Sequence, residues 1–109
     1  MSLDSYIASY AKFRPAFSKE QMMDYLERMN FSFGTKLNRL SLGNRKKFII
    51  AFALACNTPI LLMDEPTNGL DIESKKQLRR ILASLDMSNR TIIISTHQIA
   101  DLEDRKSVV

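Results

Sequence analysis

Two adjacent carboxylates, Asp64 and Glu65, follow a run of four bulky apolar residues and precede a Pro-Thr-Asn-Gly turn sequence. Such a run is typical of a buried strand, which would deliver both side chains to the edge of a sheet. Side chains of neighbouring residues at a strand end point to opposite sides. One carboxylate can therefore face a metal ion while the other faces an attacking water, and phosphoryl transfer needs both functions.

The single histidine of the chain stands in a similar position. It follows residues 91–96, a second run that contains three isoleucines, and is His97. Both features have a plainer interpretation, because an Asp-Glu pair can simply cap a turn and a lone histidine is most often structural. The apolar run before the pair, the Pro-Thr-Asn-Gly-Leu-Asp sequence after it and the place of His97 at a strand end favour a catalytic role.

The elements expected around these residues form a strand–helix–strand unit. Residues 60–64 and 91–96 are the predicted strands, and Asp71 is the predicted N-cap of the helix between them. The buried face of this helix carries apolar residues at helical spacing, namely Leu78, Ile81, Leu82 and Leu85. This order predicts a right-handed βαβ crossover in which the two parallel strands either pair directly or lie as near neighbours in the sheet. Both strands are continuously aliphatic, which predicts that both sheet faces are covered.

The first half of the chain is predicted to be mainly helical, although residues 2–17 show no clear periodicity. Ser18 and Gln21 form a predicted capping box. The helix that follows carries one apolar stripe, made of Met22, Met23, Leu26 and Met29. Methionines in such a stripe are expected to be adaptable core residues rather than ligands. Residues 48–56 are nearly all apolar and predict a buried helix whose N-terminus lies at residues 41–44.

The charge of the chain favours solvated helix faces over a nucleic-acid surface. It has 16 Lys and Arg against 12 Asp and Glu, a net charge of +4, and the two signs mostly alternate. The tightest basic group, residues 45–47, lies in the first turns of the predicted helix, where positive charge opposes the helix dipole. This placement points to an electrostatic purpose such as a nearby anionic ligand.

The composition fits one modest soluble domain. The 109 residues are 45% hydrophobic and 26% charged, which argues against disorder. No apolar stretch approaches the roughly 20 residues that cross a bilayer. The only cysteine is Cys56, so a disulfide framework is excluded and a reducing, cytoplasmic environment is predicted.

Three motifs together resemble those of the ATP-binding cassette (ABC) ATPases. Residues 60–71 closely resemble the Walker B motif and D-loop of that family, and residues 40–44 resemble its signature motif, LSGGQ. His97, which follows Ser-Thr, resembles the switch histidine of the H-loop. The resemblance spans at least residues 40–102. It implies an α/β fold, namely part of a RecA-like P-loop NTPase core with a parallel βαβ unit plus a helical subdomain.

The resemblance also implies a role for each matching residue. Asp64 would hold Mg²⁺ through its water shell, and Glu65 would orient or deprotonate the attacking water. His97 would contact the γ-phosphate of ATP, and Asp71 would couple the subunits across the interface of a head-to-tail dimer. The signature motif would bind the γ-phosphate held by the opposite subunit, through Ser41, Gly43 and Asn44.

Departures from the family pattern limit these expectations. Leu42 replaces the first signature glycine and adds bulk near the phosphate, and Asn44 replaces glutamine. A Walker A loop, G-x-x-x-x-G-K-[ST], is absent from the sequence, because no glycine precedes a lysine. No plausible Q-loop glutamine is present either. The chain alone is therefore expected to lack useful ATP affinity and ATPase activity.

These observations predict the C-terminal portion of an ABC transporter ATPase subunit. Residues 1–56 would be the helical subdomain ending in the signature helix, and residues 57–109 would be the Walker B, D-loop and H-loop part of the core. The intact protein would use ATP and Mg²⁺ at the cytoplasmic face of the membrane. Its partners would be a second nucleotide-binding subunit and a transmembrane permease, with no nucleic acid. A two-stranded sheet with exposed edges also predicts self-association of the fragment through strand pairing or exchange.

Two other functions remain open. ABC-type ATPases of DNA repair and chromosome organisation share these motifs, but they carry long heptad arms, and this chain has no sustained heptad periodicity. A non-catalytic interaction module could also keep the fold after losing the phosphate loop. The presence of Asp64, Glu65 and His97 argues against such a module.

Overall fold

The computed structural model describes residues 3–12, 14–34 and 36–95, and His97 therefore lies outside the described residues. In chain order the elements are α1 (Leu3–Ala11), α2 (Lys19–Arg28), the 3₁₀ helix η1 (Leu37–Arg39), α3 (Leu42–Ala55), β1 (Ile60–Asp64), α4 (Ile72–Ser84) and β2 (Thr91–Ser95).

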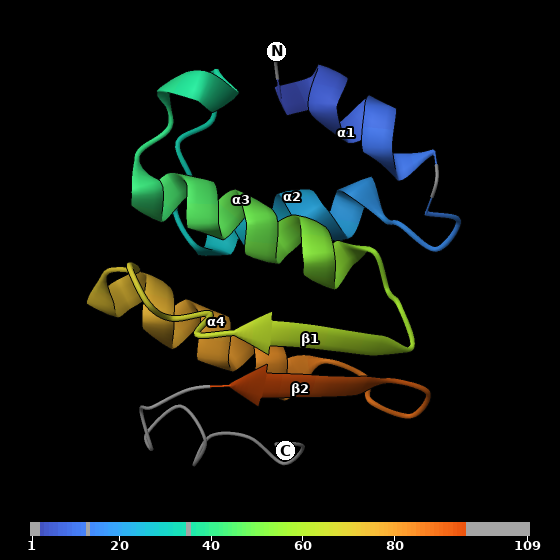
Figure 1. The fold of residues 1–109 in the computed structure, drawn as a ribbon. Coiled ribbons are helices and arrows are strands. Elements are labelled where there is room, and N and C mark those ends of the chain that lie inside the picture. Colours follow the sequence, from blue (N-terminus) through green and yellow to red (C-terminus); the bar gives the residue numbers. More distant parts are fainter. Residues whose placement is uncertain (1–2, 13, 35, 96–109) are drawn as a thin grey trace.

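The two described strands, β1 and β2, pair in parallel and are joined through α4, which confirms the predicted strand–helix–strand unit (Figure 1). The register runs from Ile60 opposite Thr91 to Asp64 opposite Ser95. Because the strands are parallel, their carboxyl ends lie at the same edge. Asp64 and the end of β2 are therefore neighbours.

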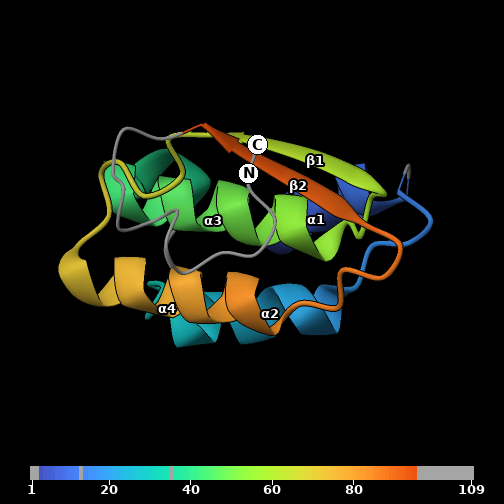
Figure 2. The same ribbon diagram turned by 90° about the horizontal axis from the view of Figure 1, so that it is seen from below.

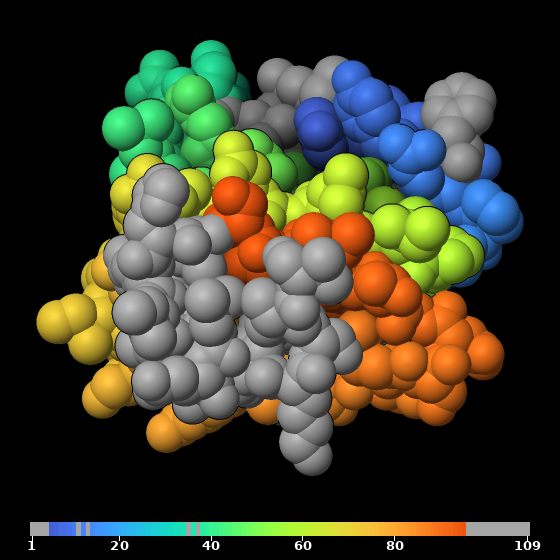
Figure 3. Space-filling view, turned by 60° about the horizontal axis from the view of Figure 1, so that its bottom comes forward, coloured from blue at the N-terminus to red at the C-terminus, as the bar shows by residue number. Residues whose placement is uncertain are grey.

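One face of this sheet is covered and the other is open among the described residues. Met63, Ile92 and Ile94 are buried, whereas Ile60 and Leu62 are 66% and 70% exposed. Figure 2 shows the described helices on one side of the two strands, and Figure 3 shows atoms of β1 (yellow-green) and β2 (orange-red) at the surface. The prediction that both faces are covered is therefore wrong for the described part of the chain, because no described element lies over the outer face.

The core lies between the sheet and the layered helices. The helix α2 packs against α3, and its predicted stripe is buried at Met22, Leu26 and Met29. The α4 side chains Leu78, Ile81 and Leu82 are buried as predicted. The Ser74 hydroxyl donates to the Met29 carbonyl at 3.3 Å in a buried contact that links α4 to the end of α2.

The predicted capping box before α2 is only half formed. The Ser18 hydroxyl accepts the Gln21 N–H at 3.1 Å, as expected of an N-cap. The Gln21 side chain, however, accepts from Asn57 Nδ2 at 2.8 Å, and the Ser18 N–H donates to the Ala55 carbonyl at 2.9 Å. A tertiary contact with the end of α3 thus replaces the reciprocal local bond.

The helix α1 lies in a segment for which the sequence shows no periodicity. Ile7 of this helix is buried, and Tyr6 makes edge-on contacts with Phe48 and Phe52 of α3, with ring centroids 5.3 Å and 5.9 Å apart. Aromatic contacts with α3, rather than a continuous apolar stripe, anchor this helix. Among the helices of the described part, none combines the length and the apolar character that crossing a membrane requires.

Candidate active site

Asp64 is the last residue of β1, and its side chain is exposed at the carboxyl end of the strand. This is the edge at which ligands bind in open α/β sheets. The structure therefore places Asp64 where the sequence predicts it.

Glu65 is positioned by a backbone turn rather than by the strand. Its φ of +49° lies in the left-handed region, which non-glycine residues rarely adopt. Its N–H donates to the Ser95 carbonyl at 2.6 Å, and its carboxylate atom Oε1 is buried. Asp64 is exposed and Glu65 is half-buried, and the backbone changes direction between them instead of continuing the alternation of a strand. Residues held in such a conformation often lie at functional sites.

The turn after Glu65 leads directly into α4. The Asn68 N–H donates to the Glu65 carbonyl at 3.1 Å, and Gly69, with a φ of +86°, completes the reversal. Pro66 and Thr67 are buried, which anchors the turn to the fold.

Asp71 caps α4, as the sequence predicts. Its carboxylate accepts the Ser74 N–H at 2.8 Å. The hydrogen bonds from Ser74 hold the pKa of the Asp71 carboxyl below its ordinary value of 3.8, and Lys47 nearby acts in the same direction. The side chain is exposed, so capping does not bury it.

The N-terminus of α3 lies beside the same turn. A Cβ on Gly43 would be 3.4 Å from the Gly69 carbonyl oxygen. The Ser41 hydroxyl caps the helix by accepting the Asn44 N–H at 3.1 Å. The signature-like segment and the turn that follows the two carboxylates therefore form one continuous surface, and Leu42 is 80% exposed on it.

The Asn44 side chain is engaged within the fold. Its Oδ1 accepts the Ser32 N–H at 3.3 Å, and its Nδ2 donates to the Ser41 and Ser32 hydroxyls at 3.2 Å and 3.3 Å. These bonds tie the connector before α3 to the helix N-terminus. Asn44 thus supports Ser41, whereas its predicted contact with phosphate stays a prediction.

The basic group at residues 45–47 is not a uniformly solvated face. Arg45 is exposed, but Lys47 is only 7% exposed and lies near Asp71. Lys46 donates from Nζ to the Glu65 carbonyl at 2.9 Å. Lys46 is not among the site residues that the sequence predicts. The sequence feature that points to a role for Lys46 is its positive charge at the start of a helix, because positive charge there opposes the helix dipole.

The carboxylates of the site could hold Mg²⁺ in only one way. Within residues 3–12, 14–34 and 36–95, no three His, Cys, Asp or Glu side chains converge to hold a metal. Mg²⁺ in phosphate-transferring sites is usually bound by one or two carboxylates together with waters and substrate phosphates. The exposed carboxylate of Asp64 fits that mode.

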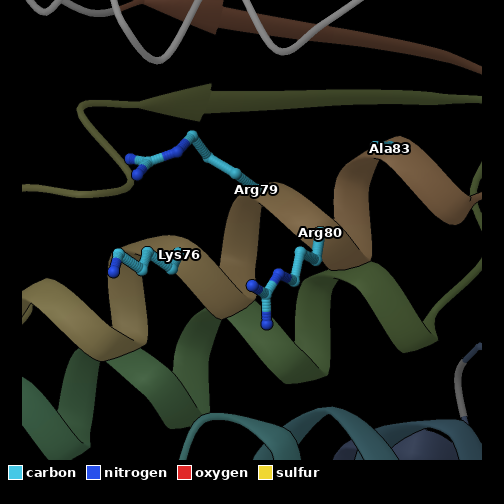
Figure 4. Close-up of a pocket in the computed structure, with 4 residues that line it drawn as sticks. All are labelled: Lys76, Arg79, Arg80 and Ala83. Atoms are coloured by element: carbon cyan, nitrogen blue, oxygen red, sulfur yellow. The ribbon is translucent and has the colours of Figure 1, made fainter.

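A separate hollow of about 430 Å³ lies along α4 (Figure 4). Among the described residues its lining comes from this helix alone, with Lys76, Arg79, Arg80 and Ala83. None of these described lining residues is a predicted site residue. The candidate site is therefore an open surface at the ends of β1 and α3 rather than this hollow.

Comparison with known families decides the assignment. Residues 5–101 match the family model described as "AAA domain, putative AbiEii toxin, Type IV TA system". The chain belongs to this AAA domain family. A Caldanaerobacter subterraneus relative, "Putative ABC transporter ATP-binding protein TTE0246", is 35% identical over 97 residues, which are 84% of this chain and 40% of the relative. The macrolide export ATP-binding/permease protein MacB of Bartonella quintana is 37% identical over 102 residues, which are 90% of this chain and 16% of MacB.

Solved structures agree with this membership. A bacterial ABC transporter cassette, determined as a dimer, has a TM-score of 0.67 and 28% identity, and the match covers 86% of this chain and 44% of that one. An ATP-bound Atm1-family ABC exporter also has a TM-score of 0.67, but at 23% identity it shows the fold alone. The predicted resemblance to ABC ATPases and the α/β fold class are confirmed. The chain spans less than half the length of these relatives and corresponds to part of an ABC-type nucleotide-binding domain.

Proposed function

We propose that this chain supplies the signature and Walker B portion of an ATPase subunit that hydrolyses MgATP and drives a membrane permease. The observation that carries the proposal is the close approach of Gly43 to Gly69, where a Cβ added to Gly43 would lie 3.4 Å from the Gly69 carbonyl oxygen. It joins the start of α3 to the turn after Asp64 and Glu65. The residues that resemble two separate family motifs therefore act from one surface.

Each residue of this surface has a proposed task. The N-terminus of α3 lies at Ser41 and Gly43, and the backbone N–H groups of such helix ends suit phosphate. In a head-to-tail dimer this helix end would contact the γ-phosphate of ATP held by a second nucleotide-binding subunit. Asp71 would contribute to the same interface, and His97 would contact the γ-phosphate bound by its own subunit.

Asp64 and Glu65 would have different roles at the reacting phosphate. Asp64 would hold Mg²⁺ through water, and the bound Mg²⁺ would neutralise phosphate charge. Glu65 would orient the attacking water and accept its proton. Its left-handed backbone aims the carboxylate away from the direction that a continued strand would give.

The remaining phosphate contacts would come from polypeptide outside these 109 residues. A Walker A sequence is absent from the chain. The open face of the sheet, with Ile60 and Leu62, is the surface on which the rest of such a core would pack. On this proposal, residues 1–109 alone have no ATPase activity, and the completed protein acts at the cytoplasmic face of the membrane through its permease.

The proposal is tested with a hybrid cassette in which residues 1–109 replace the matching segment of the dimeric bacterial relative. The hybrid should hydrolyse ATP, and Glu65→Gln should abolish turnover while ATP binding is retained. Arg80→Met on the exposed side of α4 is the matched control and should keep full turnover. A hybrid that folds and binds ATP without hydrolysing it contradicts the proposal. If residues 1–109 alone hydrolyse ATP and Glu65→Gln abolishes that activity, then no added polypeptide is needed, and this part of the proposal is wrong.

A further inference from the structure

We propose that Lys46 is a positioning residue that ties the signature helix α3 to the backbone of Glu65. The inference rests on the proposed function in one respect, because it takes Glu65 as the group that orients the attacking water. The contact itself does not depend on that function. Lys46 Nζ lies 2.9 Å from the Glu65 carbonyl oxygen in a partly buried setting.

The Glu65 peptide is held from three elements. Its carbonyl oxygen accepts Lys46 Nζ of α3 and the Asn68 N–H of the following turn, at 2.9 Å and 3.1 Å. Its N–H donates to the Ser95 carbonyl of β2 at 2.6 Å. Both backbone polar groups of Glu65 therefore have partners, which fixes the direction in which its Cα–Cβ bond leaves the backbone.

The conformation of Glu65 explains why such support is required. A φ of +49° is disfavoured for a residue with a long side chain and persists only where surrounding contacts impose it. A hydrogen bond from an ammonium group is roughly twice as strong as a neutral one. Lys46 supplies such a charged donor to the Glu65 carbonyl, and it does so from α3.

The same helix carries the proposed phosphate contacts. Gly43 is three residues before Lys46, so both lie in the first two turns of α3. A helix transmits displacement of its end as a rigid element. A shift of the α3 N-terminus on phosphate binding would therefore move Lys46 and, through it, Glu65. Lys46 thus links the phosphate bound at one site to the water-orienting carboxylate of the other.

The neighbouring basic residues provide matched comparisons. Arg45 lies on the same helix turn and is exposed, so Arg45→Met removes one positive charge without touching the Glu65 carbonyl. Lys46→Met removes the ammonium group and keeps a chain of similar length. Lys46→Arg restores a charged donor.

The first test measures amide hydrogen exchange by NMR in residues 1–109. Lys46→Met should speed exchange of the Glu65 amide by about tenfold, as expected when one charge-assisted bond is lost. Exchange at Leu78, in the middle of α4, should not change. Arg45→Met should alter neither amide, and Lys46→Arg should restore slow exchange at Glu65. Equal acceleration at both amides, or none at Glu65, overturns the proposal.

The second test uses the hybrid cassette. Lys46→Met should lower kcat by about tenfold and leave the KM for ATP within about twofold, because a positioning contact acts on the reaction step rather than on ATP binding. Lys46→Arg should recover most of the rate. An unchanged kcat in Lys46→Met overturns the catalytic part of the inference. If the unaltered hybrid hydrolyses no ATP, the proposed function fails, and the exchange measurement still decides whether Lys46 holds Glu65.

Discussion

The N–H of Glu65 donates to the carbonyl oxygen of Ser95 at 2.6 Å, one residue beyond the end of β1. The amide of Glu65 thus remains tied to the neighbouring strand while its φ of +49° turns the chain away from the sheet. Asp64 follows the pleat of the strand, and Glu65 does not. The separation of the two carboxylates is consequently a property of this turn.

The turn should store strain that glycine can release. Glu65→Gly should raise the free energy of unfolding by about 1 kcal/mol, because glycine adopts positive φ without steric cost. Gly69→Ala should lower it by about 1 kcal/mol. A Cβ at Gly69 would have no atom within 4 Å, so its cost is conformational only. Urea unfolding at pH 7 measures both. A loss of stability in Glu65→Gly contradicts the assignment of strain to residue 65.

The Asp71 cap should make stability depend on acid pH. Hydrogen bonds from Ser74 lower the pKa of the folded-state carboxyl below 3.8, so the unfolded state binds the proton more readily. The stabilisation is present above pH 3.8 and is lost as the pH falls through the lower folded-state value. Asp71→Ala should therefore unfold at lower urea concentration than the unaltered chain at pH 7, and the difference should shrink as the pH falls below 3.8. Serine also caps a helix but does not titrate in this range. Asp71→Ser should therefore stay more stable than Asp71→Ala by the same amount at acid pH as at pH 7.

Arg90 should contribute to stability through two backbone carbonyls. Its Nε and Nη2 donate to the carbonyl oxygens of Thr58 and Leu54 at 2.9 Å and 3.1 Å, which ties the start of β2 to the end of α3. Arg90→Met should lower the free energy of unfolding by about 2 kcal/mol. Arg80→Met, on the exposed side of α4, should change it by less than about 0.5 kcal/mol. Equal effects of the two variants in urea unfolding would mean that the Arg90 contacts carry no net stabilisation.

The open sheet face should drive self-association of residues 1–109. Leu62 is 70% exposed on β1. Leu62→Lys therefore places a charge on the open face of the sheet, next to the strand edge through which two copies of the chain would associate. Sedimentation velocity at high concentration should show association of the unaltered chain and a monomer for Leu62→Lys. Ile72→Gln removes another apolar side chain, 75% exposed at the start of α4, and should leave association unchanged. A monomeric unaltered chain rules out this association.

Local rules accounted for most of the elements. The strands, α3 and α4 follow from apolar runs and helical spacing, and the caps at Ser18 and Asp71 follow from residue type. Each of these depends on contacts within a few residues. The helix α1 was not predicted because Tyr6 is anchored by Phe48 and Phe52, far along the chain. The half-formed capping box at Ser18 also results from a contact between residues far apart in the sequence, because the Gln21 side chain accepts a hydrogen bond from Asn57.

The sequence by itself determined the family, the fold class and the residues that stand at strand and helix ends, among them Asp64, Glu65 and Ser41. These depend on the order and spacing of residue types, which are local. Only the tertiary structure decided that Gly43 lies against Gly69 and that Lys46 bonds to Glu65, 19 residues away. A lysine side chain is long and can reach many acceptors, and periodicity records only that a residue is basic. Its partner is set by how α3 packs beside the end of β1, which no local pattern specifies.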